Sequence, residues 1–112
     1  MATKNIEFVV NYVVEGATGT IRPIGRCGDH PIEVGDVFTL VYRNRPRETA
    51  EELATAAERI WEHPVALHVV EIQAYGRVLQ ELGEGMTGSL VLSGEGGRFV
   101  QPGFVLSVQH SS

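Results

Sequence analysis

Short runs of β-branched and aromatic residues, separated by glycine and proline, dominate the hydrophobic pattern of this chain. Such runs are typical of short strands joined by turns, because branched side chains fit a pleated sheet and glycine fits a tight turn. The pattern predicts strands at residues 7–14, 20–24, 37–43, 65–76, 86–94 and, around a Pro-Gly turn, within 99–108. Pro23 moves the second strand towards a sheet edge, because proline cannot donate to a ladder.

One segment spaces its apolar residues as a helix does rather than as a strand does. Residues 45–63 are rich in alanine and glutamate, and Thr49 with Glu52 fits the capping box of a helix N-terminus. The apolar positions that fall on one face at helical spacing are Leu53, Ala57, Ile60 and Trp61. Pro64 follows, as expected where a helix ends. The pattern therefore predicts one inserted α-helix at about residues 49–63.

Composition limits the class of protein. The 112 residues, 43% of them hydrophobic, suit one domain spanning 1–112 with a single core. A net charge of −5 argues against a broad surface that tracks nucleic-acid phosphates, but not against a small local RNA contact. With one cysteine, no secretory signal and no apolar run of membrane-spanning length, we expect a cytoplasmic protein that does not contact a membrane.

The stretch GEGMTG, Gly83 to Gly88, matches the glycine pattern of dinucleotide-binding loops. Such a loop is followed by a helix whose first backbone amides bind the pyrophosphate, whereas the residues after Gly88 have the hydrophobic pattern of a strand. Glu84 would also place a negative charge inside the phosphate cradle. We interpret these glycines as turn and close-packing positions, and we expect no cofactor.

Three segments carry a resemblance to a known family: FVVNYVVEGATGTIRPIG at 8–25, IEVGDVFTLV at 32–41, and the strand, polar excursion and glycine pattern of 69–107. In order and spacing they resemble domain two, the β-barrel, of elongation factor Tu-like translational GTPases. The resemblance implies a mainly β fold: a small closed or partly open antiparallel β-barrel with one inserted α-helix. The chain has no G-x-x-x-x-G-K-[ST] loop, so GTP hydrolysis does not carry over, and we expect no enzyme.

The resemblance also suggests a contact for an RNA end. It places Glu71 at the position of a glutamate that, in elongation factor Tu, lies against the terminal adenosine of tRNA. A tyrosine-arginine patch with Arg43, Arg45 and Arg47 offers base stacking and phosphate contacts.

Each of these features has a structural alternative. Glu71 fits the solvent face of an alternating strand in which Val70 and Ile72 point inward. The arginines would balance the glutamates that follow them in the sequence. The helix stripe likewise has two interpretations: it caps one open end of the barrel, or it forms a protein interface through Trp61, Ile60 and Leu53. We favour the structural alternative in each case.

Cys27, Asp29 and His30 form a cluster of residue types that can bind zinc or act in catalysis. Three ligands are fewer than a structural zinc site needs, and no helix N-terminus is expected near Cys27 to lower its pKa. A plain turn is the simpler interpretation, and no metal site is predicted.

These observations favour a non-catalytic, stand-alone binding module with a protein partner, because the chain is acidic and the helix adds an apolar surface. The first alternative is an accessory protein that binds a tRNA-like RNA end through Glu71 and the arginines. The second is a small-ligand or metal-binding protein that uses Cys27, Asp29 and His30. Exposed edge strands would also allow homo-oligomers.

Overall fold

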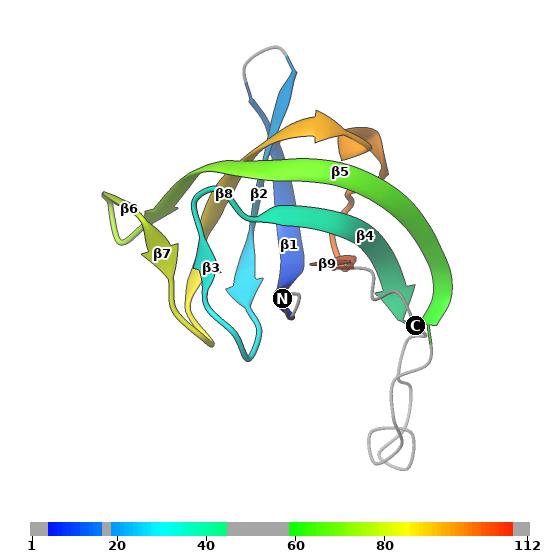
Figure 1. The fold of residues 1–112 in the computed structure, drawn as a ribbon, viewed down its shortest axis with the longest axis horizontal. Coiled ribbons are helices and arrows are strands. Elements are labelled where there is room, and N and C mark those ends of the chain that lie inside the picture. The colour runs from blue at the N-terminus through cyan, green and yellow to red at the C-terminus, as the bar shows by residue number, and fades with distance from the viewer. Residues whose placement is uncertain (1–4, 17–18, 45–58, 109–112) are drawn as a thin grey trace.

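The computed structural model describes residues 5–16, 19–44 and 59–108 of the chain. Almost all regular structure in these residues is β-sheet (Figure 1). The elements are β1 (Glu7–Glu15), β2 (Thr20–Cys27), β3 (Ile32–Glu33), β4 (Val37–Asn44), β5 (Arg59–Ala74), β6 (Arg77–Leu79), β7 (Glu81–Leu82), β8 (Thr87–Glu95), the 3-10 helix η1 (Gly97–Phe99) and β9 (Val105–Ser107).

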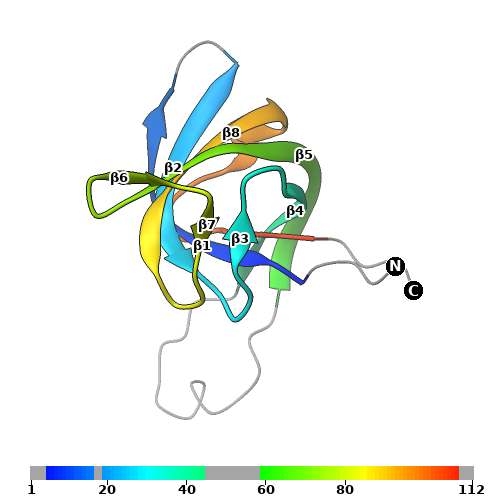
Figure 2. The same cartoon turned by 60° about the vertical axis from the view of Figure 1, so that its left-hand side comes forward.

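The main sheet closes into a six-stranded antiparallel barrel. Its strands lie in the order β4-β9-β1-β2-β8-β5, and a further pairing between β4 and β5 joins the two ends. Strand β6 pairs with the end of β5 as an extra strand, and β3 pairs with β7 in a separate two-stranded sheet (Figure 2). Thus the structure confirms a mainly β fold built on a closed barrel.

Closure depends on the length of β5, which has 16 residues. Its first part, from Arg59 to His68, pairs with β4, and residues 66–73 pair with β8. In Figure 1 this strand arches across the whole molecule. Register shifts interrupt both ladders, and such bulges increase the local bend that a small barrel requires.

Alternate positions along the strands fill the barrel interior. Fully buried side chains include Phe8, Phe38, Leu67, Leu90 and Leu106, one from each of five barrel strands. Burying a side chain of this size contributes about 1.5–3 kcal/mol relative to leaving it exposed. Along β1 and β8 the buried positions alternate, so a period of two specifies which face of these strands lines the core.

The helix prediction is wrong at its C-terminal end. Residues 59–63 belong to β5, where Arg43 pairs with Trp61 and Val41 with His63. Pro64 does not end a helix; it lies opposite Leu40, beside the register shift in the β4–β5 ladder. Cross-strand pairing outweighs local helix propensity here, as tertiary context commonly does. The remainder of the predicted helix lies outside the described residues.

Two smaller expectations also need correction. Pro23 lies in β2, which is an interior strand between β1 and β8. The β2–β8 ladder pairs Ile21 and Ile24 but not the two residues between them. Pro23, which has no backbone N–H to donate, therefore lies outside that ladder. Phe99, expected in a short strand, belongs to η1. Within the described residues, no helix has the length and apolar character needed to cross a membrane.

We predict that Gly25→Ala strongly destabilises the barrel. A Cβ atom at Gly25 would run into the carbonyl oxygen of Val9 and approach Phe8 Cε2 to 3.1 Å. Because the obstacle is backbone, we expect a loss of about 2–3 kcal/mol in the free energy of unfolding, measured by chemical denaturation. Gly83→Ala is the control, since its Cβ would meet only the flexible side chain of Met86. Equal losses for the two variants would contradict this interpretation.

A second prediction concerns the tight turn between β5 and β6. Tyr75 and Gly76 form its two central positions, with φ values of 54° and 72°. A left-handed backbone is unfavourable for tyrosine and better tolerated by asparagine, and the Tyr75 side chain is 80% exposed. We expect Tyr75→Asn to raise the free energy of unfolding by about 0.5–1 kcal/mol. Tyr12→Asn, which replaces an exposed tyrosine on β1, is the control and should not stabilise. A less stable Tyr75→Asn variant would show that the ring makes contacts that outweigh the strain.

Candidate functional site

A hollow lined with aromatic rings lies where β4 ends and β5 begins. Its volume is about 400 Å³, and its lining residues are Arg43, Trp61, Phe99, Gln101 and Phe104. We call these five residues the aromatic hollow. They come from β4, β5, η1 and the turn before β9, so segments distant in sequence meet here.

The aromatic hollow continues the core out of the barrel. Side chains two residues apart on a strand share a face, and Val69, Leu67 and Val65 are buried on the inner face of β5. The next positions of that series are His63, which is half-buried, and Trp61, which is 37% exposed. The core thus becomes progressively more accessible towards Trp61.

The rings contact one another at close range. The Trp61 ring centroid is 5.3 Å from that of Phe104 and 6.3 Å from that of Phe99, with interplanar angles of 49° and 43°. His63 stacks on Phe99 at 3.8 Å and lies 6.1 Å from Trp61. Tilted and offset pairs of this kind are favourable and hold each ring in place. The accessible part of Trp61 is therefore held in a fixed position.

Two arginines lie beside these rings. Arg43 is exposed and pairs in register with Trp61 across the β4–β5 ladder. Arg98 places its Cζ atom 4.8 Å from the centroid of the Phe99 ring, which is cation–π geometry. Among the residues that the structure describes, none of those lining the hollow carries a carboxylate. The aromatic hollow is thus an apolar surface with positive charge at its edge.

The structure places the sequence-predicted residues in different regions. It brings Arg43 and Trp61 together, whereas Glu71 lies towards the other end of β5, opposite Val91 of β8. Glu71 is half-buried and accepts a hydrogen bond of 2.6 Å from Gln73 Nε2. Glu71 and Arg43 are therefore not part of one compact site.

The remaining partner-contact residues can be placed only in part. Ile60 lies within β5, and Arg45, Arg47 and Leu53 lie outside the described residues. The expected alternation around Glu71 also needs correction. Val70 was expected to point inward but is 49% exposed, because a register shift between Val69 and Glu71 makes Val69 the inward residue.

The structure does not assemble Cys27, Asp29 and His30 into a ligand set. Cys27 is buried, and its thiol donates to the carbonyl oxygens of His30 at 3.1 Å and Leu82 at 3.5 Å. Asp29 and His30 are exposed. Across residues 5–16, 19–44 and 59–108, no three His, Cys, Asp or Glu residues are grouped so as to hold a metal ion.

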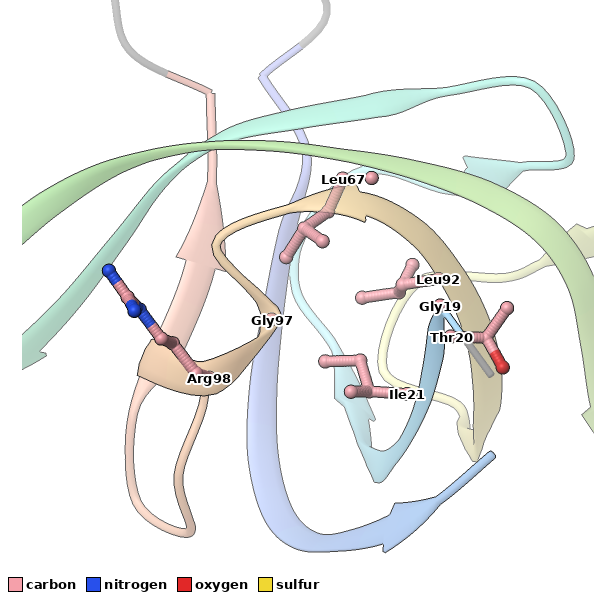
Figure 3. A pocket seen from close by; sticks show the side chains of 8 residues that line it. Gly19, Thr20, Ile21, Leu67, Leu92, Gly97 and Arg98 are labelled. Atoms are coloured by element: carbon pink, nitrogen blue, oxygen red, sulfur yellow. The ribbon is translucent and has the colours of Figure 1, made fainter. Parts of the chain in front are cut away.

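A second hollow, of about 230 Å³, lies between the β1–β2 turn and the segment after β8. Figure 3 shows Ile21, Leu67 and Leu92 at its centre, while the side chain of Arg98 points away from them. Its remaining lining is mostly glycine. This hollow offers few groups for specific recognition, so the aromatic hollow is the stronger candidate site.

Sequence reasoning identified Trp61 and Arg43 but missed His63, Phe99, Phe104 and Arg98. The alternation of Trp61 and His63 with Val65 is a strand signal that could have found His63. Nothing local marks Phe99 and Phe104 as neighbours of Trp61, because their contact depends on how the barrel closes.

The buried thiol gives a test of the structure around Cys27. Burial raises the pKa of Cys27 above its ordinary value of 9.0, with smaller contributions from Glu84 and Glu81 and an opposing hydrogen bond with the Ile32 backbone. A raised pKa lowers the thiolate fraction, so alkylation at pH 8 should be at least about tenfold slower than in the unfolded chain. Because the folded protein binds the Cys27 proton more tightly than the unfolded chain does, the free energy of unfolding should fall as the pH rises above about 9. Rapid alkylation of the native protein at pH 8 would contradict the buried placement.

Comparisons with known proteins support the fold. No family model matches the chain, and no curated protein matches it. Among solved structures, the chain is similar to translation elongation factor SelB from Methanococcus maripaludis, both in its apo form and in complex with the GTP analogue GppNHp. In each case the TM-score is 0.67, the identity is 11%, and the match covers 98% of this chain but only 20% of SelB. The resemblance to the domain-two barrel of elongation factor Tu-like GTPases is thereby confirmed for the fold.

Proposed function

We propose that this barrel is a non-catalytic binding module that contacts a protein partner at the aromatic hollow. The observation that carries this proposal is the exposed part of Trp61, fixed among Phe99, Phe104 and His63. Tryptophan and arginine are the residues most enriched where binding energy concentrates in interfaces, and Arg43 lies directly beside Trp61.

Rigidity supports the same proposal. Ordering a large side chain during association costs about 0.5–1.5 kcal/mol, and packing against neighbours reduces that cost in advance. The rings of Trp61 and Phe104 already contact one another, so a partner would meet a preformed surface. The lining residues that the structure describes are rings, an arginine and an amide, which are residue types suited to recognition rather than to proton transfer.

A short RNA end is the second candidate ligand. Trp61 offers a surface for base stacking, and Arg43 beside it offers a phosphate contact. The distance of Glu71 from this pair and the net charge of −5 favour a protein partner instead. The buried free thiol of Cys27 fits the reducing cytoplasm expected from the sequence.

We predict that Trp61→Ala abolishes retention of the partner in an affinity pull-down from the lysate of the protein's own organism. Truncating a central tryptophan should weaken binding by at least about 30-fold. Tyr75→Ala is the matched control, because it removes an exposed aromatic side chain from the β5–β6 turn, far along β5 from Trp61. Thermal unfolding should show that both variants remain folded.

The pull-down is run with and without ribonuclease. A protein recovered in near-equal amount by the unmodified chain and Tyr75→Ala, resistant to ribonuclease and lost with Trp61→Ala, supports the proposal. Equal recovery by Trp61→Ala would place the contact elsewhere, and loss after ribonuclease would favour the RNA candidate.

A further inference from the structure

Among the described residues, one arginine lines the aromatic hollow and a second lies on one of its rings, although the chain as a whole carries a net charge of −5. Arg43 is exposed next to Trp61, and Arg98 is exposed over the ring of Phe99. Arg43, the charged residue in the described lining, is therefore opposite in sign to the net charge of the chain.

A carboxylate of a ligand would bind either arginine more strongly because the neighbouring surface is apolar. Ionised hydrogen bonds between arginine and carboxylate are stronger than neutral ones, and they are screened less once a ligand covers the site. Trp61, Phe99 and Phe104 provide that apolar cover. A ligand that combines a ring with a nearby negative charge would thus use both features together.

The volume of the hollow and the net charge of the chain limit further which ligands can bind. A hollow of about 400 Å³ lies at the lower end of the range of about 300–1,000 Å³ that is common for ligand sites, which suits one large side chain. A long polyanion would be repelled by the acidic remainder of the protein, whereas one or two carboxylates can be met by Arg43 and Arg98.

We infer that the partner presents an aromatic side chain flanked by carboxylates. The ring enters the aromatic hollow against Trp61 and Phe104, and the carboxylates accept hydrogen bonds from Arg43 and Arg98. This inference rests on the proposed function, because it specifies which segment of a protein partner the hollow binds.

Trp61 is the only tryptophan in the chain, so its fluorescence reports directly on the hollow. The probe is a blocked heptapeptide with a central phenylalanine and two glutamates on each side. We expect saturable binding, and we expect Arg43→Gln to raise the Kd about tenfold, as loss of one charge-assisted hydrogen bond implies. Arg98→Gln should weaken binding in the same direction. Arg77→Gln, an exposed arginine on β6, is the matched control and should leave the Kd unchanged.

Two further peptides separate the contributions of ring and charge, and an RNA oligomer tests the alternative ligand. Replacing the four glutamates by glutamine, or the phenylalanine by alanine, should weaken binding at least about tenfold. Equal binding of the glutamine peptide, unchanged affinity in both the Arg43→Gln and the Arg98→Gln variants, or no saturable change with the acidic peptide would overturn the inference. Tighter binding of an octauridylate than of the acidic peptide would overturn it in favour of an RNA end.

The inference and the proposed function can fail separately. If Trp61→Ala removes a protein partner in the pull-down but that partner's contact segment has no aromatic residue among carboxylates, the proposed function stands and the inference is wrong. If the partner is retained by Trp61→Ala, the proposed function itself is wrong.

Discussion

The pairing of β4 with β5 is the interaction on which the rest of the structure depends. Without it, the order β4-β9-β1-β2-β8-β5 would leave an open sheet with two unpaired edges. Because β5 is long enough to pair with β4 near its start and with β8 further along, one strand joins both ends. The six strands of the closed barrel leave no open edge between β4 and β5 and enclose the main core.

Closure also creates the candidate site. Strand β9 pairs with β4 only from Leu40 to Tyr42, whereas β5 pairs with β4 as far as Asn44. The β4–β5 ladder therefore extends beyond β9 at the end of β4. The side chains that point inward on this extension are not fully covered by the barrel. Phe99 and Phe104 pack against these positions and leave part of Trp61 accessible.

The likeness to SelB concerns architecture, since identity is 11% and this chain covers a fifth of the SelB length. Barrels of one architecture serve many purposes, and function depends on the side chains placed on them. In this chain the distinctive placement is a ring cluster lined by Arg43, with Arg98 lying on its Phe99 ring, in a chain of net charge −5. That combination, rather than the barrel, is the basis for a specific ligand.

The sequence by itself determined the strand-rich class, most strand positions and the order of elements that resembles a translation-factor barrel. Alternation and glycine placement are local signals, and for β1, β4 and β8 they agree with the tertiary structure. The GEGMTG stretch was also interpretable locally, because the residues after Gly88 form β8 and no helix.

Only the tertiary structure decided the state of residues 59–63 and the composition of the site. Alanine and glutamate near Trp61 favour a helix locally, but the partner that makes this segment a strand is β4, which precedes it in the chain. The exposure of Val70 follows from a register shift against β8, and the contact of Trp61 with Phe104 follows from closure. Hydrogen bonding between strands and packing between rings join residues far apart in sequence, so no local pattern can encode them.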